Sequence, residues 1–328
     1  IVSLTLVWGL LLGLLGSATA FAPLVADAAQ WFERRRGTAV GVAASGIYVA
    51  GAVWPPIVQA LIEAGGWRLA CGVMAGLSAL GMPLLAWGLR QRPPPAVLPA
   101  ATTVPVGAAA ASSSAPVAPR PLGVVPSARP FGLPPAVAMS LLCVAGLACC
   151  VAMAMPQVHL VAYCTDLGLG AARGAEMLSL MLGLGILSRL ASGVIADRIG
   201  GLRTLLLGAS LQGLMLLLYI PFDSMVSLYV ISALFGLFQG GIVPSYAIIV
   251  REHFATARLG LLTGTVLMAT QVGMALGGWM SGWVFDWAGS YTAAFLNGAA
   301  WNLLNLIVVG ALLWRVLPRR GKAQTIAG

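Results

Sequence analysis

The sequence predicts an all-α integral membrane protein. Of its 328 residues, 59% are hydrophobic and only 8% are charged, whereas a soluble domain carries about 25% charged residues. Three early runs, at residues 1–24, 38–62 and 69–89, contain no charged residue. In lipid, each segment must satisfy its own backbone hydrogen bonds, and these runs lack the alternating polarity of a barrel strand. We therefore expect helices.

Nine apolar segments are long enough to cross a bilayer. A crossing needs about 20 helical residues because the hydrocarbon core is about 30 Å thick. The nine predicted spans cover residues 2–26, 39–62, 69–89, 136–163, 176–196, 204–221, 225–250, 259–284 and 292–314. Glycines four residues apart favour close helix packing. Such pairs are Gly9/Gly13, Gly236/Gly240, Gly273/Gly277 and Gly278/Gly282.

A proline-rich segment divides these spans into three and six. Twelve of the chain's 20 prolines lie between Pro93 and Pro135. Such a composition gives an extended, flexible chain rather than a packed core. The sequence therefore predicts three parts: residues 1–90 with three helices, a disordered Pro/Ala-rich linker over 91–133, and residues 134–328 with six helices.

The basic residues predict the orientation in the membrane. With Arg34–Arg36, the linker and the C-terminal tail on the cytoplasmic side, fifteen of the 18 lysines and arginines lie on that side. Arg68 and Arg173 then lie outside, and Arg189 lies within a span. This positive-inside bias predicts a multi-pass protein of the plasma or inner membrane, with the linker and C-terminus cytoplasmic. Because nine spans would place Ile1 outside, we expect that earlier spans are missing from this chain.

Charge and cysteine content exclude several classes of protein. The formal net charge is +9, but the basic residues sit at the ends of apolar runs and form no clustered patch typical of nucleic-acid binding. The five cysteines lie mostly inside spans, where they are expected to pack as small apolar residues. We therefore expect the lipid bilayer as the surroundings, and no nucleic acid, metal or cofactor.

A charged loop follows the fifth predicted span. Gly193, Asp197, Arg198, Gly200 and Arg203 follow a G-x-x-x-D-R-x-G-x-x-R spacing. This spacing resembles the loop between helices 2 and 3, and again between helices 8 and 9, of major facilitator superfamily transporters. The resemblance implies a major facilitator-type bundle with nine of the usual twelve helices present. The three spans before the linker then resemble helices 4–6, and the six after it resemble helices 7–12.

Other segments resemble one branch of that superfamily. The stretch from Trp31 to Gly37, the sequence Gly66-Trp67-Arg68 and the sequence Gly289-Ser290-Tyr291 are similar to monocarboxylate and oxalate/formate-like transporters. The resemblance implies alternating access around a central substrate site, with the Asp197 loop as a gate that locks the cytoplasmic side. The competing interpretation of this loop is helix capping with charges that set the topology.

Arg189 is the first candidate for binding a substrate. An arginine inside a span costs at least about 2.5 kcal/mol to insert, so it is expected to face a cavity or a partner. A guanidinium binds a carboxylate through two hydrogen bonds. By resemblance, Arg189 matches an arginine in helix 8 of monocarboxylate transporters, but Gly185 stands where those transporters carry an aspartate. The alternative is that Arg189 extends toward the cytoplasmic face.

Four further polar residues within spans are candidates for the substrate site. They are His159, Gln239, Tyr246 and Gln271. Gln239 and Tyr246 lie close to Gly240-Gly241, where a helix is expected to bend during transport. His159 is a candidate gate or proton relay. For each of them, a hydrogen bond to another helix or to the interface is the competing interpretation.

Together these features predict a secondary active transporter of small organic anions (carboxylates), acting as a monomer by alternating access. One alternative is a truncated fragment that does not transport by itself. A remote alternative is an intramembrane enzyme, which would need a nucleophile, an acid pair or a metal-binding set within spans. The chain has only two histidines and no acidic residue at the centre of a predicted span. We therefore expect no enzyme activity and no catalytic residues.

Overall fold

The computed structural model describes residues 36–88, 129–254 and 259–316. All regular secondary structure within these ranges is helical, as the sequence predicts. The predicted span at 2–26, Gly9/Gly13 and most of the predicted linker lie outside the described residues. The chain divides into two compact units, one formed by Ile1–Gly46 with Cys71–Gly123 and the other by Ile47–Ala70 with Val124–Gly328.

Helix α3, Arg36–Gly88, carries the second and third predicted spans. As one straight helix its 53 residues would extend about 80 Å, far beyond a ~30 Å hydrocarbon core. The backbone leaves helical geometry at Gly65 (φ −155°, ψ 17°) and Gly66 (φ 79°, ψ 174°), between the two predicted spans. The positive φ of Gly66 requires a residue without a side chain, which explains why a glycine interrupts the helix here.

Seven helical stretches among the described residues are long and apolar enough to cross a membrane. The first overlaps two of the predicted spans, 39–62 and 69–89, and the other six overlap the six predicted spans after the linker. Because the span at 2–26 is outside the described residues, the count of nine stays a prediction. The seven stretches are Ser45–Gly88, Pro135–Asp166, Ala171–Ile199, Gly201–Leu218, Met225–His253, Leu259–Ala288 and Tyr291–Val316.

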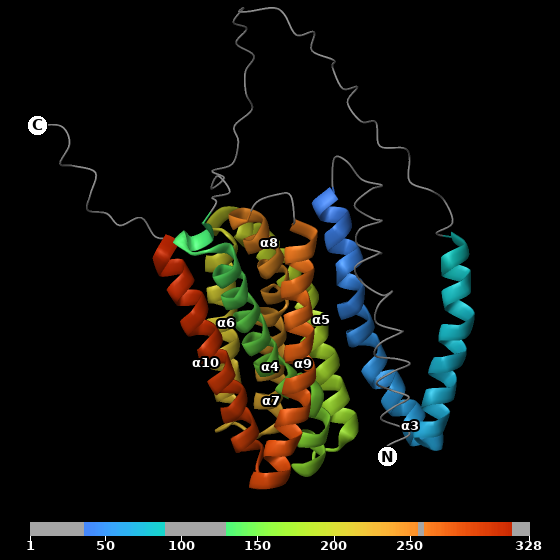
Figure 1. Cartoon of the computed structure of the whole chain (residues 1–328). Coiled ribbons are helices and arrows are strands. Elements are labelled where there is room, and N and C mark those ends of the chain that lie inside the picture. Colours follow the sequence, from blue (N-terminus) through green and yellow to red (C-terminus); the bar gives the residue numbers. More distant parts are fainter. Residues whose placement is uncertain (1–35, 89–128, 255–258, 317–328) are drawn as a thin grey trace, which may run out of the picture. The chain divides into compact units, whose positions relative to one another are not determined.

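The helices after the linker form what we call the C-terminal bundle (Figure 1). Its most extensive interfaces are those of α4 with α9 and α10, and that of α5 with α7. Helix α6 packs against α10, α8 and α7. In chain order the helices are α4 Pro135–Asp166, α5 Ala171–Ile199, α6 Gly201–Leu218, α7 Met225–Gln239, α8 Ile242–His253, α9 Leu259–Ala288 and α10 Tyr291–Val316.

Two clusters of buried side chains lie inside this bundle. One contains Leu142 and Tyr246 and extends to the last residues of α8. The other contains Tyr219, Phe235 and Phe295, and the rings of Tyr219 and Phe295 stack with centroids 4.9 Å apart. Because lipid tails are as apolar as these side chains, tight packing rather than escape from water holds membrane helices together.

Glycines bring neighbouring helices of the bundle close together. A Cβ added at Gly236 or Gly240 would clash with the backbone of α5, at the carbonyl oxygens of Met181 and Gly185. Added Cβ atoms at Gly273 and Gly277 on α9 would clash in the same way with the backbone of α4. The close packing predicted for these two glycine pairs is therefore confirmed.

Candidate functional site

Arg189 lies well inside α5, eighteen residues after its first residue and ten before its last. The side chain is half-buried. Its guanidinium carbon lies 4.7 Å from the ring centroid of Tyr48, a residue of α3 within the same unit. A cation over an aromatic face is attracted by the ring's quadrupole. The structure therefore places this arginine within the span and against an aromatic ring.

Gly185 makes room for that ring. It lies one helical turn before Arg189, and a Cβ added at this position would be 2.5 Å from two carbon atoms of the Tyr48 ring. Real Cβ atoms do not approach that closely, so even alanine would force the ring to move. By resemblance, Gly185 stands where monocarboxylate transporters carry an aspartate. Its structural role here is to leave room for the ring of Tyr48.

The helix next to α5 is interrupted at Gly240 and Gly241. Helix α7 ends at Gln239 and α8 begins at Ile242. An added Cβ at Gly240 would lie 2.9 Å from the Cβ of Ser188, and one at Gly241 would clash with Ser192. Both glycines keep right-handed helical dihedral angles (Gly240 φ −60°, ψ −28°; Gly241 φ −88°, ψ −9°). The position where a bend is expected is therefore a short turn between two helices, and it packs on the part of α5 that carries Arg189.

Gln239 is fully buried at this turn. Its Oε1 accepts a hydrogen bond of 2.8 Å from Nε2 of Gln157 on α4. The Nε2 of Gln239 has no hydrogen-bond partner among the described residues. The pair links α4 to α7, and it leaves one buried amide donor next to the turn.

The other three candidates have separate surroundings. Tyr246 is fully buried, and its hydroxyl donates a 3.0 Å hydrogen bond to Oδ1 of Asn305. Nε2 of His159 lies 2.9 Å from the carbonyl oxygen of Gly278 on α9. Gln271 is exposed on α9. For Tyr246 and His159 the structure shows the interhelical contacts of the competing interpretation.

The predicted gating loop forms the tight connection between α5 and α6. Helix α5 ends at Ile199, Gly200 has a φ of 85°, and α6 begins directly at Gly201. Glycine is needed at position 200 because this positive φ disfavours other residues. Asp197, Arg198 and Arg203 are exposed, as is Gly193 one turn earlier. Within the described ranges, the Asp197 side chain makes no hydrogen bond or ion pair.

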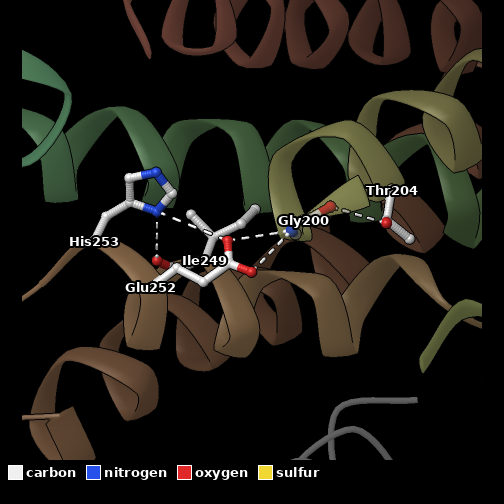
Figure 2. Close-up of polar contacts among 6 residues, drawn as sticks. Gly200, Thr204, Ile249, Glu252 and His253 are labelled. Carbon is white, nitrogen blue, oxygen red and sulfur yellow. Dashed lines mark hydrogen bonds and ion pairs between the residues drawn. The ribbon is translucent and has the colours of Figure 1, made fainter. Parts of the chain in front are cut away.

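A different carboxylate contacts this loop, and sequence reasoning missed it. Both carboxylate oxygens of Glu252, near the end of α8, lie 3.1 Å from the backbone nitrogen of Gly201 (Figure 2). The first amides of a helix lack partners within the helix and carry positive partial charge, so a carboxylate there is stabilising. Glu252 therefore ties α8 to the beginning of α6. Its signal in the sequence is an acidic residue at the end of a span whose neighbours are basic.

Glu252 belongs to a small polar network at this end of the bundle (Figure 2). Nδ1 of His253 lies 3.2 Å from the carbonyl oxygen of Ile249 and 3.9 Å from Oε2 of Glu252. The hydroxyl of Thr204 donates a 2.9 Å hydrogen bond to the carbonyl oxygen of Gly200. The loop is thus fixed from both of its sides, by α8 and by the first turn of α6.

The last residues of the predicted linker pack onto the same network. Phe131, in the short 3-10 helix η2 (Pro130–Gly132), is only 6% exposed. Its ring stacks on His253 with centroids 4.5 Å apart. Phe131 also has a φ of 57°, which is rare for a bulky residue and indicates that packing holds it in place.

Within the described residues, no three His, Cys, Asp or Glu side chains come close enough together to hold a metal ion. The described residues contain three separate groupings of interest. They are Arg189 with the ring of Tyr48, the amides of Gln157 and Gln239, and the charged connection between α5 and α6.

The family model of the Major Facilitator Superfamily matches residues 1–227 and 177–327, which together cover nearly the whole chain. The chain belongs to the Major Facilitator Superfamily. This confirms the family predicted from the Asp197 loop, and with it a multi-pass membrane protein of a transporter family rather than an enzyme.

Named relatives identify the branch of the superfamily. Monocarboxylate transporter 13 from Bos taurus and that from Rattus norvegicus are each 30% identical over 290 residues, covering 88% of this chain and 62% of the relative. Monocarboxylate transporter 12-B from Danio rerio is 26% identical over 347 aligned residues, covering 97% of this chain and 69% of the relative. The chain is thus a member of the monocarboxylate branch, and it spans 62% of the length of transporter 13.

Proposed function

We propose that this protein is a secondary active transporter of small organic anions, in particular carboxylates, and that it works by alternating access. The observation that carries the proposal is the position of Arg189, a cation inside a membrane-spanning helix and over the ring of Tyr48. Charged residues within spans are costly, and they mark substrate or ion pathways. A guanidinium also has the planar donor pattern that matches a carboxylate.

The substrate site in this proposal lies between α5 and the turn that joins α7 to α8. Arg189 provides the charge, and the ring of Tyr48 orients the guanidinium by covering one of its faces. The buried Nε2 of Gln239, which has no partner among the described residues, provides a neutral donor. Interrupted helices at the site of binding are a recurring feature of secondary transporters.

The proposed conformational change moves the C-terminal bundle as one body. Glu252 joins α8 to α6, and the glycine contacts join α5 to α7 and α9 to α4, so the helices of this half are fastened to one another. The exposed Asp197 and Arg198 are then available to contact the other half of a transporter in only one of its two states. This is the gating role that we propose for the loop.

Uptake measurements test the role of Arg189. The full chain is reconstituted into proteoliposomes, and accumulation of a radiolabelled short-chain monocarboxylate is measured for wild type, Arg189→Ala and Arg189→Lys. We expect uptake to fall at least about tenfold in Arg189→Ala and less in Arg189→Lys. The lysine ammonium keeps the positive charge but cannot form the two parallel hydrogen bonds of a guanidinium. Arg173→Ala is the matched control, since Arg173 is an exposed arginine paired with Glu176 on the same helix.

Two results would count against the proposal. Equal uptake by wild type and Arg189→Ala would remove Arg189 from the substrate path. Binding of the carboxylate without uptake would instead favour the alternative that this chain binds substrate but does not transport alone.

We further propose that the protein is monomeric, in a plasma or inner membrane with its linker and C-terminus cytoplasmic. Light scattering in detergent and cysteine labelling in intact cells test these two points.

A further inference from the structure

The C-terminal bundle contains a pocket at the end opposite the Gly200 loop. It lies where α4 ends and where α6 connects to α7 and α9 to α10, which Figure 1 shows at the lower end of the bundle. Its volume is about 410 Å³, within the range of small-molecule sites. Its aromatic and acidic lining residues are Tyr163, Asp166, Tyr219, Asp223, Phe285, Tyr291 and Phe295.

Aromatic rings form much of the pocket wall. Tyr163, Tyr219 and Phe295 are 7%, 0% and 1% exposed, so these rings face the inside of the bundle. The aromatic residues of a membrane-interface belt face lipid headgroups instead. The ring of Tyr291 lies 4.8 Å from that of Tyr163 and 4.2 Å from that of Phe285. The rings thus form a continuous wall rather than isolated anchors.

The charged groups of the pocket are all negative. Two of the twelve lining residues, Asp166 and Asp223, are carboxylates, and none is basic. The hydroxyl of Tyr291 donates a 2.9 Å hydrogen bond to Oδ2 of Asp166, which fixes that carboxylate at the wall. The hydroxyl of Tyr163, a residue that is more than nine-tenths buried, hydrogen bonds to no described residue. Arg173, the basic residue at the start of α5, is already paired with Glu176 at 2.9 Å.

We propose that this pocket binds a small organic cation with a quaternary ammonium group. Aromatic walls with carboxylates are how proteins recognise such groups, because the ring faces attract the cation while the acids balance its charge. A metal ion would instead need several converging oxygen ligands. The same charges repel a carboxylate, so this site is distinct from the proposed anion site at Arg189. It also does not depend on that proposal.

Choline provides the test, because it has a neutral isostere of the same shape, 3,3-dimethylbutan-1-ol. Binding of both compounds to the purified full chain in non-ionic detergent is measured by saturation-transfer NMR and calorimetry. We expect saturable choline binding and at least about tenfold weaker binding of the isostere, since the attraction depends on charge. Equal binding of the two compounds, or no binding of choline, would overturn the proposal. This comparison uses the unmodified protein, so it does not depend on any variant folding.

Variants then locate the site. Asp166→Asn and Asp223→Asn should each weaken choline binding severalfold, and the double variant at least about tenfold. Asp286→Asn is the matched control, because Asp286 is an exposed carboxylate next to the lining residue Phe285 but does not line the pocket. If Asp286→Asn weakens binding as much as the pocket variants do, binding is a general effect of surface charge and the assignment is wrong.

The ammonium group has two sources, a free solute or the headgroup of a choline lipid. Choline affinity is therefore compared in nanodiscs of phosphatidylglycerol and of phosphatidylcholine, at high ionic strength so that the negative surface of phosphatidylglycerol does not itself concentrate choline. Weaker choline binding in phosphatidylcholine shows that the headgroup competes for the pocket. Equal affinity in both shows that a free solute is the ligand, and both results support the ammonium chemistry. Choline binding in neither nanodisc would overturn it.

Discussion

The ring of Tyr48 lies over the guanidinium of Arg189, 4.7 Å from ring centroid to guanidinium carbon. The contact exists because residue 185 has no side chain, since any Cβ there would overlap the ring. Tyrosine and arginine come from helices more than a hundred residues apart in the chain, so their pairing is a property of the fold. It also explains physically why position 185 holds a glycine where monocarboxylate transporters carry, by resemblance, an aspartate.

We predict that Gly185→Ala destabilises the protein by displacing Tyr48. A cation–π contact contributes about 0.5–2 kcal/mol, so the thermal unfolding midpoint in detergent should fall by several degrees. Gly183→Ala is the control on the same helix, because its Cβ would make only an ordinary contact, 3.7 Å from Ala52. Tyr48→Phe keeps the ring and should be milder than Tyr48→Ala. Equal melting of the two glycine variants would contradict the role given to Gly185.

Gly236→Ala should lower the stability more than the same substitution at a glycine whose added Cβ would contact no other atom. The added methyl group would meet the backbone of α5 at Met181, and backbone cannot rotate away as a side chain does. Overpacking of this kind costs about 1–3 kcal/mol. Denaturation in detergent measures it, with Gly264→Ala as the control, since no atom lies within 4 Å of a Cβ added there. A Gly236→Ala variant as stable as Gly264→Ala would show that the two helices are not in close contact.

The two carboxylates near the Gly200 loop should have different effects. Glu252→Ala removes the contact with the Gly201 amide and should cost about 1 kcal/mol of stability, as the loss of a helix cap does. Asp197→Asn removes the charge of an exposed side chain, so it should leave stability unchanged and reduce the rate of uptake. Unfolding and uptake are measured on both variants. If Glu252→Ala instead slowed uptake without loss of stability, and Asp197→Asn lowered stability without slowing uptake, the structural role would belong to Asp197 and the gating role to Glu252.

The hydrogen bond between Gln157 and Gln239 should have a modest coupling energy. Single replacements by leucine and the double replacement form a double-mutant cycle. Hydrogen bonds between membrane helices average about 0.6 kcal/mol in such cycles, so we expect a coupling energy of that order. The pair His159 and Gly278 is unsuitable as a control, because the acceptor there is a backbone carbonyl. Gln157 with Gln271, which is exposed on α9, is the control cycle and should give no coupling. A coupling near zero for Gln157 and Gln239 would mean that the two side chains do not interact in the membrane.

The helices were predictable because lipid requires each span to be apolar and internally hydrogen bonded. The glycine contacts followed from spacing alone, as at Gly236 and Gly240. The sequence did not predict which residues of different helices contact one another. The basic neighbours of Glu252 mark it in the sequence, but nothing there shows that its partner is an amide 51 residues away. Likewise, the sequence does not show that Gln239 faces Gln157 while Gln271 is exposed, because both lie in apolar helices with little variation in polarity around them.

The stacking of Phe131 on His253 gives the long connection between the two sets of spans a fixed point of attachment. The residues just before α4 are thereby joined, through His253 and its neighbour Glu252, to the first amide of α6. The beginning of one helix and the end of another thus share a single anchoring point with the helix start that follows the charged loop.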